Sequence, residues 1–192
     1  MIHASTTLVI VGSVRRQRIC PQIAAWVAET GAAAGVPTAF ELVDLRDWPL
    51  PMDDEPDIPA AKPPYANPLT QAWSRKVSEA QAVILVTPQY NWGYPAPLKN
   101  ALDHLFHEWA GKPAMIVTYG GHGGGRCAAQ LRQVVEALHM APVATMPALT
   151  LSRAHIEANA GAIDPGVEFA GHAEELNAAF AELAAALSSR PI

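Results

Sequence analysis

The sequence has few cysteines, no long apolar run and no excess of positive charge. Its two cysteines in 192 residues give no disulfide framework. The N-terminus lacks the charged-then-apolar segment of a secretory signal, and no apolar run reaches the ~18 residues that a membrane span requires. The net charge of −5 and the lack of a long basic block disfavour nucleic acid as a partner. These absences predict a cytoplasmic protein that binds neither membranes nor nucleic acid.

Apolar β-branched runs alternate with amphipathic stretches along the chain. Strands are expected at 6–11, 38–45, 82–87, 114–119 and, more weakly because Pro147 interrupts it, 141–151. Helices are expected around 23–27, 69–80, 98–109, 131–138 and 176–187, where apolar residues recur at helical spacing. Strand and helix thus alternate five times. We expect one α/β domain over residues 1–192, with an open sheet covered by helices on both faces.

This topology predicts where a ligand binds. Loops that leave the carboxyl ends of parallel strands meet at one edge of the sheet, where such folds bind their ligands. Three loops with unusual residues occupy these positions, namely 12–20, 88–96 and 119–126. By contrast, the proline-rich stretch 49–68 fits neither a helix nor a central strand, and we interpret it as a stiff surface connection.

The first loop, "GSVRRQR", has the composition of an anion site. A strand–turn–helix offers unpaired N–H groups and about half a positive charge at the helix N-terminus. Gly12 permits a tight turn, Ser13 offers a hydroxyl, and Arg15 and Arg18 offer charge-assisted hydrogen bonds to phosphate. We interpret Arg16 as solvated, and a wholly solvated arginine cluster is the alternative. The ATP-type GxxxxGK[ST] and dinucleotide GxGxxG motifs are both missing here, which favours a terminal phosphomonoester.

The other two loops fit a flat ring. Tyr90, Asn91, Trp92 and Tyr94 place aromatic side chains beside backbone amides, as a heteroaromatic ligand requires. The stretch "YGGHGGGR" at 119–126 exposes backbone N–H groups. The alternatives are a small local core for the aromatic residues and a merely flexible glycine loop. Together, the three loops predict a phosphorylated ring cofactor, for which FMN is the natural candidate.

Three ordered segments resemble the NAD(P)H-dependent FMN reductase family of flavodoxin-like proteins, namely "GSVRRQR", "TPQYNWGYPAPLKNALDHL" and "WAGKPAMIVTYGGHGGGR". The resemblance implies a three-layer flavodoxin-like sandwich with strand order 2-1-3-4-5, and a homodimer or homotetramer. It also implies phosphate contacts from the first loop, ring contacts from Gln89 to Trp92, and donors to the pyrimidine edge from the glycine loop. The cofactor site so predicted comprises Gly12, Ser13, Arg15, Arg18, Pro88, Gln89, Tyr90, Asn91, Trp92, Tyr119, Gly120 and Gly121.

The resemblance further implies an enzyme in which hydride passes from NAD(P)H to flavin N5 and then, as two electrons, to a small-molecule acceptor. Quinones, free flavin, azo dyes and metal oxyanions are the acceptors expected. Because the flavin performs the chemistry, no dedicated catalytic side chain is expected. A one-electron carrier of the flavodoxin type and a non-enzymatic flavin-binding module are the alternatives. We expect no metal site, and we interpret His104, His107 and Glu108 as a solvated or subunit-contact face.

Overall fold

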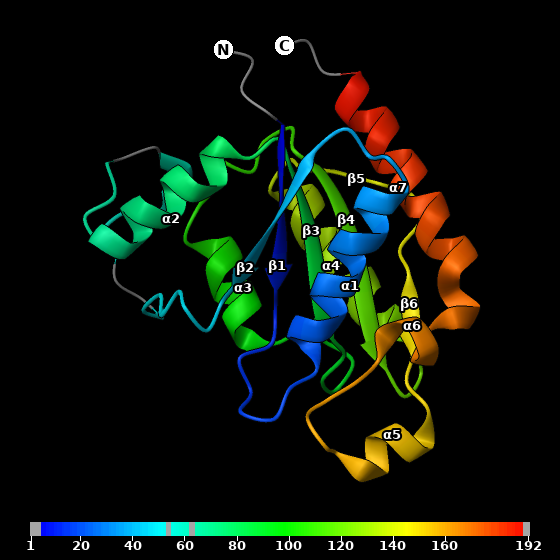
Figure 1. Cartoon of the computed structure of the whole chain (residues 1–192). Coiled ribbons are helices and arrows are strands. Elements are labelled where there is room, and N and C mark those ends of the chain that lie inside the picture. The colour runs from blue at the N-terminus through cyan, green and yellow to red at the C-terminus, as the bar shows by residue number, and fades with distance from the viewer. Residues whose placement is uncertain (1–4, 53–54, 62–63, 190–192) are drawn as a thin grey trace.

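The computed structural model describes residues 5–52, 55–61 and 64–189 (Figure 1). In chain order its elements are β1 (Thr6–Val11), α1 (Cys20–Ala33), β2 (Ala39–Asp44), the 3₁₀ turn η1 (Pro59–Ala61), α2 (Pro68–Glu79), β3 (Ala82–Pro88), α3 (Ala96–Asp103), β4 (Pro113–Gly120), α4 (Gly125–Ala137), β5 (Ala141–Pro142), β6 (Ala148–Thr150), α5 (Arg153–Ala158), α6 (Pro165–Glu168), the 3₁₀ turn η2 (Ala170–His172) and α7 (Ala173–Ser188).

The described strands form one parallel sheet in the order β2-β1-β3-β4-β5, with β6 also paired to β4. This confirms the predicted flavodoxin-like order. All seven residues of β3 are buried, as expected for a central strand covered on both faces. The carboxyl ends of the strands all point toward the lower edge in Figure 1, where the loop after β1 and helix α5 also lie.

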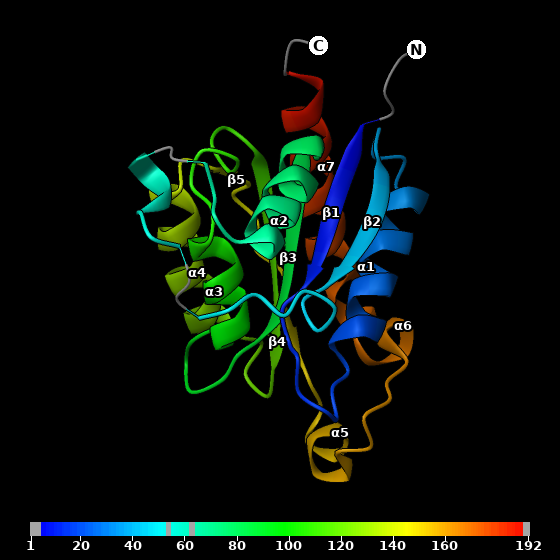
Figure 2. The ribbon, with the colours of Figure 1, turned by 90° about the vertical axis from the view of Figure 1, so that its left-hand side faces the viewer.

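Helices cover both faces of the sheet (Figure 2). One face packs against α1 and α7, and the other against α2, α3 and α4. On the α1 side, Gly31 lies against the rings of Phe40 and Phe180, which meet edge to face with centroids 6.2 Å apart. The three-layer prediction is therefore confirmed. No helix within the described ranges has the length and apolar character needed to cross a membrane.

The predicted fifth strand is two short strands that pair with opposite ends of β4. Ala141 pairs with Pro113, whereas Ala148 pairs with Thr118. Between them the chain turns toward α7, where the Glu182 carboxylate accepts hydrogen bonds from the backbone N–H groups of residues 144 and 145. Pro147 has no N–H to donate, so the strand is broken where the sequence places this proline.

The helix expected around 98–109 ends earlier, since α3 stops at Asp103 and turns follow. The apolar pattern beyond it includes Trp109, which is buried beside Trp73 of α2. The indole N–H of Trp109 donates to the Leu102 carbonyl at 3.0 Å, and that of Trp73 donates to the Ala101 carbonyl at 2.8 Å. These carbonyls belong to the last turn of α3, where carbonyl groups lack N–H donors within the helix. The apolar pattern therefore predicted the burial of these residues correctly, but it predicted helix beyond Asp103, where the structure has turns.

The proline-rich stretch is a connection, as predicted, but its described residues are anchored to α3. Asn100 Nδ2 donates to the carbonyls of Leu50 and Pro51, at 3.0 and 3.2 Å. His104 is buried, with Nε2 2.7 Å from the Pro51 carbonyl and Nδ1 3.0 Å from the Thr70 hydroxyl. The interpretation of His104 as solvated is therefore wrong. Residues 53, 54, 62 and 63 of the stretch lie outside the described residues.

Candidate functional site

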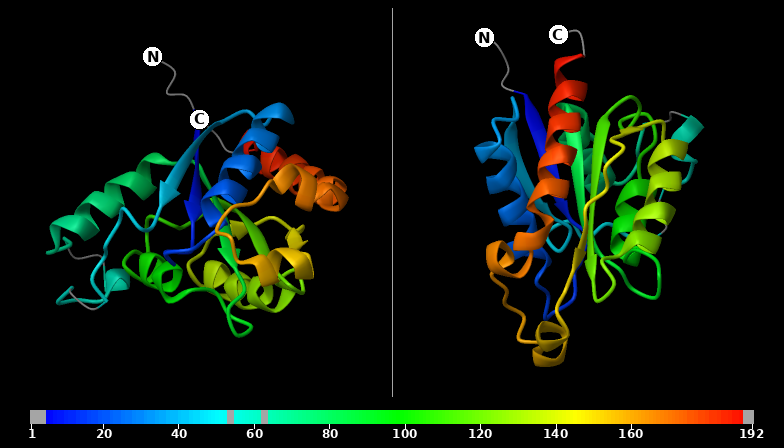
Figure 3. Two further views of the ribbon diagram at one scale, coloured as in Figure 1. Left: turned by 60° about the horizontal axis from the view of Figure 1, so that its bottom comes forward. Right: turned by 90° about the vertical axis from the view of Figure 1, so that its right-hand side faces the viewer.

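The loops after β1, β3 and β4 meet at one edge of the sheet (Figure 3, left). A cavity of about 260 Å³ lies between them. Eight predicted site residues line it, namely Arg15, Arg18, Pro88, Gln89, Tyr90, Tyr119, Gly120 and Gly121. Four others, Gly12, Ser13, Asn91 and Trp92, are not among its lining residues. The topology thus brings together loops that lie far apart in the sequence.

The first loop is fixed where it leaves β1. Gly12 donates its N–H to the Val86 carbonyl at 2.9 Å. A Cβ at Gly12 would lie 3.0 Å from that same oxygen and 3.2 Å from Leu98 Cδ2, so a side chain would push β1 and β3 apart. Ser13 is fully buried, and its hydroxyl lies 3.0 Å from the hydroxyl of Tyr90. This hydrogen bond joins the first loop to the aromatic loop.

The start of α1 has the features of an anion cradle. Its N-cap residue, Ile19, provides no side-chain hydrogen bond to the first N–H groups of the helix. The helix dipole adds about half a positive charge at this end. Arg15 is exposed, and its guanidinium lies 3.6 Å from the ring centroid of Tyr90. The cavity therefore has a cation and a helix N-terminus on one side.

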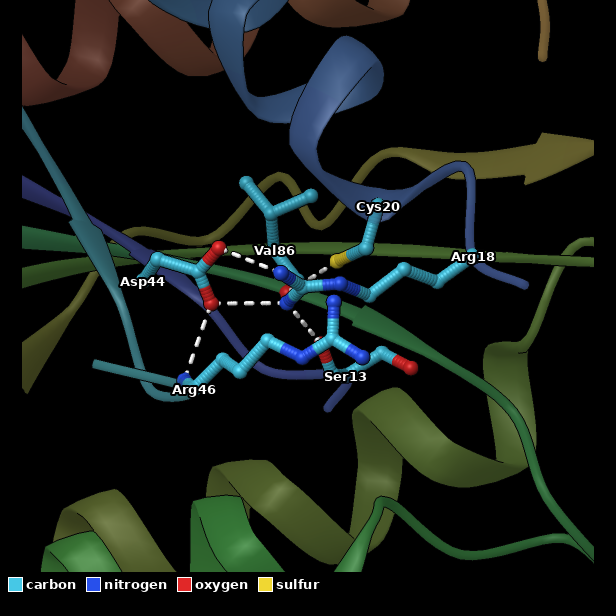
Figure 4. Close-up of polar contacts among 6 residues, drawn as sticks. All are labelled: Ser13, Arg18, Cys20, Asp44, Arg46 and Val86. Carbon is cyan, nitrogen blue, oxygen red and sulfur yellow. Dashed lines mark hydrogen bonds and ion pairs between the residues drawn. The ribbon is translucent and has the colours of Figure 1, made fainter. Parts of the chain in front are cut away.

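Arg18 also lines the cavity, but its guanidinium bonds to protein groups (Figure 4). It forms a bidentate ion pair with Asp44, the last residue of β2. It also donates to the Ser13 carbonyl. Arg15 and Arg18, which look equivalent in the sequence, therefore differ in how much of their charge faces the cavity.

The aromatic loop is a tight turn between Tyr90 and Gly93, whose backbones exchange two hydrogen bonds at 2.8 and 2.9 Å. Asn91 and Trp92 both have positive φ, at 49° and 70°. Asn tolerates this conformation, but for Trp it is strained by roughly 1–2 kcal/mol. The Trp92 side chain is 59% exposed and stacks with the guanidinium of Arg126 at 3.8 Å. Trp92 thus belongs to a second hollow beside α4 and closes no local core.

The glycine loop requires glycine at defined positions. A Cβ at Gly123, where φ is 73°, would lie 2.6 Å from the Ala148 carbonyl oxygen. Gly120 differs, because a Cβ there would meet only Gln89 Cβ, at 3.7 Å, among the described atoms. It would otherwise project into open space at the cavity wall. A ligand can therefore approach the Cα of Gly120 closely from the cavity side.

One wall of the cavity comes from a segment that sequence analysis did not single out, residues 151–161. Leu151 donates its N–H to the Gly120 carbonyl at 2.9 Å, and Ile156 lies so close to Gly121 that a Cβ there would be 2.9 Å from its Cδ1. At the far end, Asn159 Nδ2 lies 3.4 Å from Gln17 Oε1. The segment, which includes α5, therefore arches from the glycine loop to the first loop. Its sequence carries no binding motif, because only tertiary contacts place it here.

The two thiols lie beneath the site and are buried. Burial raises the pKa of Cys20 to about 11 and that of Cys127 to about 12. Both are protonated at neutral pH and are poor nucleophiles. Among the described residues, no three His, Cys, Asp or Glu side chains come together as a metal site would require.

The site fits a ligand that is anionic at one end and flat at the other. The cation and the helix N-terminus suit a phosphate, whereas Pro88, Tyr90 and the unobstructed Cα of Gly120 suit a flat ring. Residues 5–153 match the family model described as NADPH-dependent FMN reductase. The chain belongs to this family. The predicted class, an enzyme that contains FMN and oxidises NAD(P)H, is thereby confirmed.

Relatives agree with this assignment. An NAD(P)H-dependent FMN reductase of Schizosaccharomyces pombe is 53% identical over 185 residues, which cover 96% of this chain and 91% of that protein. A quinone reductase of Pseudomonas putida is 31% identical, with 77% of each chain covered. Among solved structures, the flavoenzyme FerB of Paracoccus denitrificans, an NAD(P)H:acceptor oxidoreductase, superposes with a TM-score of 0.71 at 19% identity, over 98% of this chain and all of that one. This last similarity shows the shared fold.

Proposed function

We propose that this FMN reductase holds its cofactor in the cavity at the sheet edge and reduces quinone-type acceptors. The phosphate would lie against the first loop and the start of α1, and the ring against the loops after β3 and β4. The observation that supports this proposal is that one cavity has Arg15 and the start of α1 on one side and the unobstructed Cα of Gly120 on the other. The predicted residues outside its lining, Gly12, Ser13, Asn91 and Trp92, would shape or flank the site.

The side chains of the site bind and orient. Arg15 supplies a charge that no described carboxylate neutralises within ion-pair distance, and charge-assisted bonds to phosphate are the stronger kind. Tyr119 is buried, and burial raises its pKa well above the ordinary value, so its hydroxyl stays neutral beside the cavity. When bound, FMN would supply the redox chemistry, the transfer of two electrons and one proton from NAD(P)H to a quinone, and the second proton of the hydroquinone would come from water.

Quinones are the acceptor class that the wall of the cavity favours. Ile19, Leu151 and Ile156 contribute apolar groups to a lining that also carries polar groups such as those of Arg15 and Gln89. A flat apolar ring with polar oxygens at its edge matches such a lining. The Pseudomonas putida relative that is named a quinone reductase supports the same class.

Anaerobic reduction tests this proposal. Purified protein loaded with FMN should show the flavin absorption bands, lose them on addition of NADPH or NADH, and regain them on addition of benzoquinone. Steady-state turnover should follow the same order of substrates. Failure to bind FMN would refute the proposal. Reduction without quinone turnover, with rapid oxidation by one-electron acceptors instead, would indicate a flavodoxin-type carrier.

Arg15→Met and Arg16→Met form a matched pair for the phosphate site. Both remove one positive charge from the same exposed loop, but only Arg15 lines the cavity. Loss of a charged hydrogen bond worth about 1.5–3 kcal/mol predicts roughly 10- to 100-fold weaker FMN binding for Arg15→Met. Arg16→Met should change the dissociation constant by less than about threefold. Equal losses in the two variants would mean that the loop attracts phosphate only through its general charge.

We further propose that residues 1–192 form one domain and that the protein is a cytoplasmic homodimer. The exposed side chains of Met52 and Ile58 support dimer formation, since they are 75% and 70% exposed and line one shallow hollow together. Light scattering behind a sizing column tests the assembly. A monomer at micromolar concentration would contradict it.

A further inference from the structure

The guanidinium of Arg18 is held by the protein on two sides, although the sequence predicts it as a phosphate ligand. Nη1 lies 2.5 Å from the Ser13 carbonyl oxygen and 2.7 Å from Asp44 Oδ1, and Nη2 lies 2.5 Å from Asp44 Oδ2 (Figure 4). These contacts use three of the five N–H donors of the guanidinium. Only 8% of the Arg18 side chain is exposed. Little of this charge is therefore available to a ligand.

Asp44 stands where it can anchor the loop. It is the last residue of β2, and it pairs in register with Val11, the last residue of β1. Its carboxylate also accepts the backbone N–H of Arg46 at 2.9 Å. The ion pair thus connects the end of one strand to the loop that leaves the neighbouring strand. In doing so it neutralises Arg18, whereas Arg15 keeps an open guanidinium over Tyr90.

Ser13 is the residue that this arrangement holds in place. Arg18 binds its carbonyl, and Tyr90 binds its hydroxyl at 3.0 Å. One residue earlier, the N–H of Gly12 binds the Val86 carbonyl. The same carbonyl lies 3.3 Å from Cys20 Sγ, at the first turn of α1. The peptide groups between β1 and α1 are therefore oriented from both sides of the loop.

We propose that Arg18 is a positioning residue, and that with Asp44 it forms a clamp that sets the conformation of the phosphate loop without touching the phosphate. Asp44 thereby becomes a residue of the cofactor site that no sequence motif indicates. This inference rests on the proposed FMN site. It assigns phosphate recognition to Arg15 and the start of α1, and it assigns preorganisation of the loop that carries them, through Ser13, to the clamp.

The protonation behaviour of the pair agrees with a persistent clamp. The hydrogen bond to Asp44 raises the pKa of Arg18, although burial opposes this. For Asp44, burial acts to raise the pKa, but the hydrogen bonds from Arg18 and from the Arg46 N–H lower it below the ordinary value. Both groups stay charged across the range in which the enzyme would bind FMN.

Binding of FMN and of riboflavin to the apoprotein tests the clamp, because only FMN carries the phosphate. The variants are Arg18→Lys, Arg18→Met and Asp44→Asn, with Arg16→Met as the control for loss of charge. Lysine keeps the charge but lacks the planar fork that bonds Asp44 and the Ser13 carbonyl together. We expect each clamp variant to lower the preference for FMN over riboflavin by about tenfold. Riboflavin binding should stay within about twofold of wild type, which shows that the ring site is intact.

Two results would overturn the clamp. If Arg18 were a direct phosphate ligand, its release from Asp44 would strengthen FMN binding, so a raised preference for FMN over riboflavin in Asp44→Asn contradicts the inference. Full retention of that preference in Arg18→Lys contradicts it as well. The arginine side-chain ¹⁵N–¹H spectrum gives a second readout. On titration with FMN the Arg15 signals should shift and those of Arg18 should stay, and shifts of equal size would identify Arg18 as a ligand. Wild-type apoprotein that binds neither flavin would instead refute the proposed function.

Discussion

Replacing Tyr90 by Phe should destabilise the apoprotein more than removing the serine hydroxyl that Tyr90 binds. The change keeps the ring under Arg15 and removes only the hydroxyl that lies 3.0 Å from Ser13 Oγ. Ser13 is 0% exposed, so its hydroxyl is left without a partner, at a cost of about 1–3 kcal/mol. Tyr90 is partly exposed, so in Ser13→Ala its hydroxyl can bond to water. That variant should lose only about 0.5–1.5 kcal/mol.

Urea denaturation of the apoprotein measures these differences directly. The double variant lacks both hydroxyls and should be more stable than Tyr90→Phe alone, because no buried polar group is then unpaired. Tyr94→Phe is the matched control, since the Tyr94 hydroxyl makes no hydrogen bond to a described residue. It should stay within about 0.5 kcal/mol of wild type. Equal stability of Tyr90→Phe and wild type, or additive losses in the double variant, would refute the reasoning.

Three further predictions concern the core, the thiols and pH. Gly31→Ala places a Cβ 2.6 Å from the two phenylalanine rings beside it, and the resulting overpacking of about 1–3 kcal/mol should exceed the gain of about 1 kcal/mol in helix propensity. In urea denaturation this variant should be less stable than wild type, whereas Gly171→Ala, which meets no atom within 4 Å, should be unchanged. Burial raises the pKa of Cys20 to about 11 and that of Cys127 to about 12. A thiol reagent at about pH 8 should therefore label both cysteines only after denaturation, and rapid labelling of the native protein would contradict this. The pKa of Asp44 in the folded protein lies below the ordinary value of 3.8, so its ionised carboxylate stabilises the fold above about pH 4 and loses this contribution as the pH falls. The difference in unfolding free energy between wild type and Asp44→Asn should therefore shrink as the pH falls from about 6 to about 3. A stability difference that grows as the pH falls would have the opposite sign and would exclude the Arg18–Asp44 ion pair as its cause.

The fold could be predicted because its signals are local. Continuous β-branched runs such as 82–87 identify buried parallel strands, and the alternation with helices leaves few topologies open. The two errors in secondary structure have one cause. Around Trp109 and around Pro147, apolar residues recur where the backbone is neither helix nor continuous strand, because tertiary hydrogen bonds replace the regular ones. Burial shapes the sequence pattern, whatever backbone conformation achieves it.

The candidate site was predictable to the level of its loops. The run "GSVRRQR", the aromatic loop and the glycine loop each carry local chemistry, and their place after successive strands predicts that they meet. The sequence does not predict which of Arg15 and Arg18 lacks an ion-pair partner among the described residues, because an arginine residue alone does not indicate which acceptor its guanidinium will bind. The partner of Arg18 lies 26 residues away, at the end of a different strand.

By itself, the sequence determined the class of the protein, the strand order through its family resemblance, and the three loops that meet at the candidate site. The tertiary structure alone decided that Asp44 neutralises Arg18, that residues 151–161 form a wall of the cavity, and that Asn100 and His104 anchor the proline-rich stretch. The physical reason is the distance along the chain over which each interaction acts. Periodicity and turn chemistry act over a few neighbouring residues, whereas these contacts join groups up to 142 residues apart, such as Gln17 and Asn159, which only the folded sheet brings together.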